Sequence, residues 1–96
     1  MGASKDNNYT HEEVLMSQFG RAMAHPARSR MINLLKENKS FRNTDMCKEL
    51  KMGVSSVHAH IKILKEADLI HVEYATHEYH ITLHQENFQL YYNLLT

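Results

Sequence analysis

The chain has 96 residues, 11 basic and 11 acidic side chains and a hydrophobic fraction of 43%, which fits one globular domain and leaves little room for a second. No apolar run approaches the roughly 18 residues of a membrane span, and residues 1–6 lack the apolar stretch of a signal peptide, so we expect no membrane segment. The single cysteine, Cys47, cannot form an internal disulfide, which fits a reducing cytoplasm.

The first half of the chain predicts a short tail followed by two helices. Residues 1–9 are polar and are expected to be disordered, which leaves 10–96 as the folded domain. Thr10 stands three residues before a glutamate, as in a capping box, and apolar residues follow at helical spacing, so a helix is predicted over His11–Ala24. A second helix is predicted over Pro26–Glu37, because proline ends one helix and suits the first turn of the next.

A short third helix and a longer fourth helix are predicted next. Phe41 is expected to be a buried anchor, and Thr44 is expected to cap a helix over Asp45–Leu50. Gly53 interrupts the chain, and a fourth helix is predicted from Val54 or Ser55 to Ala67. The inner stripe of that helix has apolar residues at i, i+4 and i+7, namely Val57, Ile61 and Leu64.

From Leu69 the apolar period changes from helical to two, which predicts a β-hairpin with its tip near Thr76–His77. Two registers keep its apolar face intact. We prefer the register that pairs Glu73 with His80, because the other places two glutamates opposite each other. A last helix is predicted over Gln85–Leu95.

This order of elements predicts an α+β, mostly helical, winged helix-turn-helix, whose fourth helix would enter the major groove of double-stranded DNA. Its outward face carries short polar groups and one cation, and it would read the groove through Ser55, Ser56, His58, Ala59 and Lys62. Four basic residues are further candidates for contacts with DNA phosphates, namely Arg42, Lys48, Lys51 and Lys65. His77, at the tip of the wing, is the last candidate for a contact with DNA. The alternative interpretation is an ordinary solvated helix face.

Charge is distributed unevenly along the chain. Between Pro26 and Lys65 there are nine basic and three acidic residues, a net charge of +6, and the remainder carries −6. This distribution fits one face that meets phosphates, although an uneven solvated surface would produce it too.

The first and last helices carry more apolar surface than a monomer of this size can cover, which predicts a homodimer. The expected interface residues are Val14, Leu15, Met16, Phe88, Tyr91, Tyr92, Leu94 and Leu95.

Two segments resemble the ArsR/SmtB family of repressors. The segment Phe19–Leu35, with its His25-Pro26-x-Arg28 element, is similar to the opening of that family's domain, and Val57–Ile70 is similar to its recognition helix and the start of its wing. The resemblance implies a homodimer built from the first and last helices, repression by operator binding, and release by a signal. Metal sensing is common in the family.

The chain departs from the family pattern where metal ligands would stand. Ser29 replaces an aliphatic residue, and Gly53 replaces a capping serine. Arg42 and Thr44 occupy the family's thiolate positions, and the last helix has Glu86 as its one acid and no histidine. We therefore predict no metal and no cofactor. The alternative is a metal site formed by three histidines near the wing: His77, His80 and His84.

Enzyme motifs are missing from the sequence, which has no Gly-rich phosphate loop, nucleophile elbow or HExxH, so no catalytic residue is predicted. Cys47 is interpreted as a small half-buried helix residue. The predicted function is a sequence-specific repressor that binds a pseudo-palindromic operator as a homodimer. Two alternatives stay open, a winged-helix protein-interaction module and a ligand- or metal-responsive sensor, and any effector is unknown.

Overall fold

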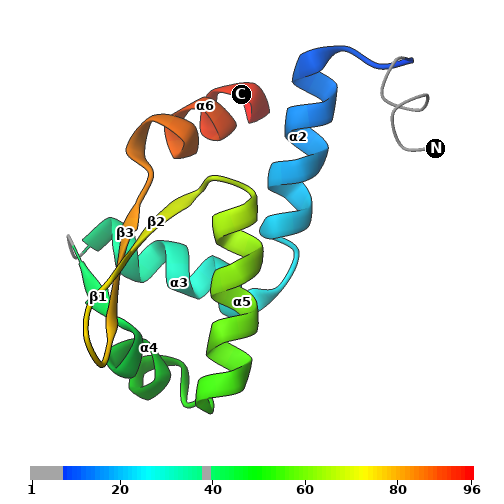
Figure 1. The fold of residues 1–96 in the computed structure, drawn as a ribbon. Helices are drawn as coiled ribbons and strands as arrows, with labels where there is room; N and C mark the ends of the chain where they lie inside the picture. Colours follow the sequence, from blue (N-terminus) through cyan, green and yellow to red (C-terminus); the bar gives the residue numbers. More distant parts are fainter. Residues whose placement is uncertain (1–7, 38–39) are drawn as a thin grey trace.

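The computed structural model describes residues 8–37 and 40–96, so residues 1–7 of the predicted tail lie outside the described residues. Its elements have the predicted order, with one added strand (Figure 1). They are α2 (His11–Ala22), α3 (Pro26–Glu37), β1 (Phe41–Arg42), α4 (Asn43–Leu50), α5 (Val54–Glu66), β2 (Ile70–Tyr74), β3 (Tyr79–Leu83) and α6 (Gln85–Leu95). The predicted α+β winged-helix class is confirmed. None of the helices in the described ranges is long and apolar enough to cross a membrane.

Helix α2 begins as predicted and ends two residues early. The Thr10 hydroxyl accepts a hydrogen bond from the Glu13 amide at 3.1 Å, and the Glu13 carboxylate accepts one from the Thr10 amide at 2.9 Å. The helix stops at Ala22 rather than Ala24, with Met23 as its C-cap. Because Pro26 disfavours helical backbone in the residue before it, the chain needs several residues to change direction before α3.

Helix α4 begins at Asn43, so the predicted start at Asp45 and the predicted Thr44 cap are wrong. Arg42 is the N-cap, with extended backbone and no side-chain capping hydrogen bond. The reason is that Phe41–Arg42 forms strand β1, which pairs with β3 and leads directly into the helix. A two-residue strand leaves no periodic signal in the sequence.

The sheet is antiparallel in the order β1-β3-β2. Glu73 pairs with His80, as predicted, and Phe41 pairs with Ile81. Phe41 is half-buried and packs against the core, so it anchors β1 without being enclosed.

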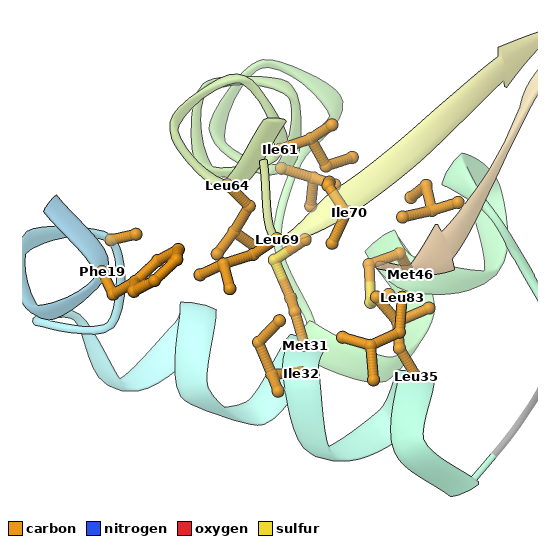
Figure 2. Packing of buried hydrophobic residues seen from close by; sticks show 13 residues of the cluster. Phe19, Met31, Ile32, Leu35, Met46, Ile61, Leu64, Leu69, Ile70 and Leu83 are labelled. Carbon is orange, nitrogen blue, oxygen red and sulfur yellow. The ribbon is translucent and has the colours of Figure 1, made fainter. Parts of the chain in front are cut away.

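The core lies between α3, α5 and the sheet. Figure 2 shows side chains from these elements converging, with Met31 of α3 next to Leu69 and Leu35 of α3 next to Leu83. The predicted inner stripe of α5 is confirmed, because Val57, Ile61 and Leu64 are all buried. Burying this stripe turns the opposite face of α5 to solvent and so fixes which residues it presents.

Candidate nucleic-acid interface

Helices α4 and α5 form a helix-turn-helix joined by residues 51–53. Lys51 caps α4 in the left-handed conformation (φ 54°), and its amide donates to the Lys48 carbonyl at 3.3 Å. Gly53 is the N-cap of α5 and has no side chain to occupy the first-turn amides. Those amides are therefore free to donate to a phosphate, which suits the N-terminus of a helix that approaches DNA.

The outward face of α5 exposes all five predicted base-reading residues: Ser55, Ser56, His58, Ala59 and Lys62. Lys48 and Lys51, the predicted phosphate contacts beside it, are exposed too. His77 is exposed in the loop between β2 and β3. In Figure 1, α4, the first turns of α5 and this loop lie toward the same end of the molecule, whereas α2 and α6 lie toward the other.

Two tyrosines connect the wing to α5. The rings of Tyr74 and Tyr79 lie 5.5 Å apart, and the Tyr79 ring meets His58 edge-on at 6.2 Å. The Nζ atom of Lys65 lies 5.3 Å from the centre of the Tyr74 ring and 3.5 Å from its hydroxyl. Lys65, predicted as a phosphate contact, is thus directed toward the wing.

Tyr79 also joins the wing to α4. Its amide donates to the Asn43 side chain at 3.0 Å. Burial raises the pKa of the Tyr79 hydroxyl, with smaller contributions from Cys47 and Tyr74, so the hydroxyl keeps its proton. Tyr79 is therefore fixed by backbone and ring contacts to both helices of the helix-turn-helix.

Arg42, another predicted phosphate contact, forms ion pairs with two acidic side chains. Its guanidinium donates to both oxygens of Asp45, at 3.0 and 3.2 Å, and lies 3.7 Å from Glu78, which also meets His80 at 3.1 Å. The hydrogen bond from Arg42 lowers the pKa of Asp45, so that carboxylate stays charged beside it. Because these two acids offset the charge of its guanidinium, Arg42 attracts a phosphate less strongly than its place in the basic segment predicted.

The comparisons with known proteins decide the family. The family model for the bacterial regulatory proteins of the arsR family matches residues 25–72, which is half of the chain and runs from α3 through the helix-turn-helix into β2. This chain belongs to the arsR family. It is a DNA-binding transcriptional regulator, as the sequence predicted.

Solved structures agree on the fold of this arsR-family protein. It is similar to an ArsR family transcriptional regulator, with a TM-score of 0.77 and 18% identity over 86% of this chain and 84% of that one. It is similar to HlyU from Vibrio cholerae N16961, with a TM-score of 0.76 and 17% identity over 90% and 94% of the chains. NolR from Sinorhizobium fredii gives a TM-score of 0.69 and 18% identity over 88% and 85%. No curated protein matches the sequence.

The three wing-side histidines of this arsR-family protein do not converge. His77 is exposed in the loop, His80 meets Glu78, and His84 stacks on His71 with ring centres 4.5 Å apart. Within residues 8–37 and 40–96, no group of three or more histidine, cysteine, aspartate or glutamate side chains is placed to hold a metal ion.

Sequence reasoning missed the residues that hold the wing in place. In the sequence, Tyr74 and Tyr79 are apolar members of the alternating pattern of the hairpin, and no local motif marks Asn43. The two tyrosines are cross-strand partners at the end of the sheet, where Tyr79 packs against the edge of the core and Tyr74 is exposed. The sequence does show a large aromatic residue at the outer end of each strand of the hairpin. It does not show which residue of α5 each tyrosine contacts, because that depends on tertiary packing.

The predicted dimer residues lie on α2 and α6. Three of them are exposed, namely Met16, Tyr92 and Leu95, and the other five are half-buried. Four of the half-buried residues pack against the core of the same chain: Leu15, Phe88, Tyr91 and Leu94. Tyr91 meets Phe19 at 5.0 Å, and Phe88 lies under the Lys36 ammonium at 5.4 Å. No residue of α6 is buried.

Proposed function

We propose that this protein represses transcription by binding a pseudo-palindromic DNA operator as a homodimer. The observation that carries the proposal is the exposed face of α5, flanked by a wing that Tyr74 and Tyr79 attach to it. A helix presented in this way fits the major groove of DNA, and the attached hairpin reaches the neighbouring sugar–phosphate backbone of the DNA.

The roles within the interface follow from position and charge. Ser55 and Ser56 stand in the first turn of α5, where short side chains approach base edges. Lys48, Lys51 and Lys62 are exposed cations that form no salt bridge among the described residues, so we assign them the main phosphate contacts. Arg42 and Lys65 contribute less, because each is held by neighbours in the chain.

A second copy of the chain is proposed to cover α2 and α6. Helix α6 rests on the domain through one side and exposes Tyr92 at 56% and Leu95 at 58%. An 11-residue amphipathic helix with no buried residue gains stability when a partner covers its free face. Two-fold pairing through these helices gives the dimer two copies of α5, which matches a pseudo-palindromic site.

The test is selection of bound duplexes from a random pool, followed by salt titration on the enriched and a scrambled duplex. We expect a palindromic consensus and steep salt dependence with a sequence preference. Salt dependence without a sequence preference would leave both the DNA-binding regulator and the protein-interaction module open, because non-specific contacts with phosphates produce it too. The DNA target implies action in the cytoplasm, and no catalytic role is proposed.

A further inference from the structure

Arg28 is the one charged residue in the described core. Its side chain is 9% exposed and points from α3 toward α2 and α5. Nε donates to the Ala22 carbonyl at 2.6 Å, and Nη2 lies 3.4 Å from the Arg21 carbonyl, so the guanidinium holds the end of α2. Nη1 lies 3.0 Å from Nδ1 of His60, which stands in the middle of α5.

The chemistry of this contact fixes the protonation of His60. A guanidinium carries only hydrogen-bond donors, so Nδ1 of His60 must accept, and its ring is neutral with the proton on Nε2. His25, in the turn between α2 and α3, covers the same ring at a centroid distance of 4.5 Å. His25 is held in turn, because its Nδ1 accepts from the Ala27 amide at 3.0 Å.

In the part of the chain that the structure describes, neither Arg28 nor His60 forms an ion pair with an acid. Within the described residues, no carboxylate lies within ion-pair distance of Arg28. The groups that face His60 from the neighbouring elements are Arg28 of α3 and His25 of the turn. Arg21 of α2 and Glu66 of α5 line the hollow beside Arg28 without pairing with it. A proton added to His60 would meet positive charge from two sides.

We propose that Arg28 and His60 form a positioning contact that fixes the recognition helix against the α2–α3 corner, and that acid opens this contact. His60 is a positioning residue, because it is half-buried against Arg28 and His25, whereas His58 and Lys62 are exposed. Burial lowers the pKa of His60 below its ordinary 6.5, and the charges of His25 and Arg28 lower it further, which agrees with the geometry.

The consequence for DNA binding rests on the proposed function. Helix α2 belongs to the proposed dimer interface and α5 to the DNA interface, so their relative position sets the separation of the two recognition helices. When His60 is protonated, two N–H groups oppose each other where one donor met one acceptor. Helix α5 then loses its polar connection to α2, and specific binding weakens.

The free protein provides a test that does not depend on DNA. Long-range ¹⁵N–¹H spectra of the wild type should show His60 with its proton on Nε2, and its titration midpoint should lie below 6.5. A proton on Nδ1, or a midpoint at or above that value, would overturn the proposal even if the protein binds DNA.

His60→Asn is the matched variant, because an asparagine oxygen can take the place of Nδ1 as acceptor and does not titrate. Fewer protons bind His60 in the folded than in the unfolded wild type, so the wild type should lose stability as pH falls through 6.5. The variant should lose less stability than the wild type over the same pH range, and we expect this difference to be roughly tenfold in the unfolding equilibrium constant. The exposed control His11→Asn on α2 should behave like the wild type.

The DNA arm compares both proteins on the duplex enriched from a random pool, between about pH 7.5 and about pH 5.5. The ratio of their affinities cancels effects of the wing histidines, which both proteins share. We expect the ratio of variant to wild-type affinity to rise roughly tenfold on acidification. A constant ratio would reject the coupling to DNA, whereas failure of both proteins to prefer any duplex would reject the proposed function.

Discussion

His58 on the recognition helix and Tyr79 on the wing meet edge to face, with ring centres 6.2 Å apart and Nδ1 of His58 3.4 Å from the tyrosine oxygen. This contact joins the element that reads the groove to the element that flanks it. Since Tyr79 also binds Asn43 of α4 through its amide, the angle of the wing is set by both helices of the helix-turn-helix.

Tyr79→Phe and Tyr79→Ala should therefore differ. The phenylalanine variant keeps the ring contacts with Tyr74 and His58 and loses only a long hydrogen bond, so it should cost less than about 1 kcal/mol in unfolding free energy. The alanine variant also loses the aromatic pairs, worth ~0.5–1.5 kcal/mol each, and should weaken operator binding further. Urea unfolding and operator titration measure the two effects. Equal losses for both variants would show that the ring does not orient the wing.

Lys62 and Lys65 lie three residues apart on α5 and should respond differently to alanine substitution. Lys62 is exposed and has no acidic partner within the described chain, so Lys62→Ala should remove a phosphate contact from each subunit. The slope of log affinity against log salt should become shallower by ~0.9 for each lost contact, or roughly two units for a dimer.

Lys65→Ala is the matched control for that experiment. Lys65 lies over the Tyr74 ring, so its loss should change the salt slope by less and should lower stability slightly through the lost cation–π contact, by ~0.5–1 kcal/mol. If Lys65→Ala reduces the slope as much as Lys62→Ala, Lys65 leaves the wing when DNA binds.

Local signals were enough to predict most of the fold. The capping box at Thr10, the helix start at Pro26 and the stripe of Val57, Ile61 and Leu64 each act over a few residues, and each was found where expected. The register of the hairpin followed from repulsion between glutamates. Strand β1 was missed because it exists only through pairing with β3, a partner distant in the sequence.

The site was less predictable, because charge in a sequence does not show where a side chain is directed. Arg42 and Lys65 counted toward the basic segment, yet one is paired with Asp45 and the other covers Tyr74. The contact of His60 with Arg28 spans 32 positions in the sequence. Such pairs depend on the crossing of α3 and α5, which no local pattern encodes.

Ser55 should contribute to sequence preference without contributing to salt dependence. It is exposed in the first turn of α5 and carries no charge. Ser55→Ala should leave the salt slope and binding to a scrambled duplex unchanged, and it should reduce discrimination by ~1–3 kcal/mol if the hydroxyl reads a base. Parallel titrations on the enriched and scrambled duplexes measure this difference. An unchanged preference would assign base reading to other residues of the exposed face.

Leu95→Asp should separate the proposed dimer. Leu95 is 58% exposed on α6, and a second copy of the chain is expected to cover it. Burying an unpaired carboxylate at a two-fold interface is unfavourable, and each dimer would contain two of them. Sedimentation should show a dimer for the wild type and a monomer for the variant, with operator affinity falling because the second half-site is no longer bound in the same complex.

Gln85→Glu adds the same charge to the first turn of α6, where the helix dipole favours an acid, and should remain dimeric. A wild-type monomer at tens of micromolar would reject the interface, and a dimeric Leu95→Asp variant would place the interface on another face of α2 and α6.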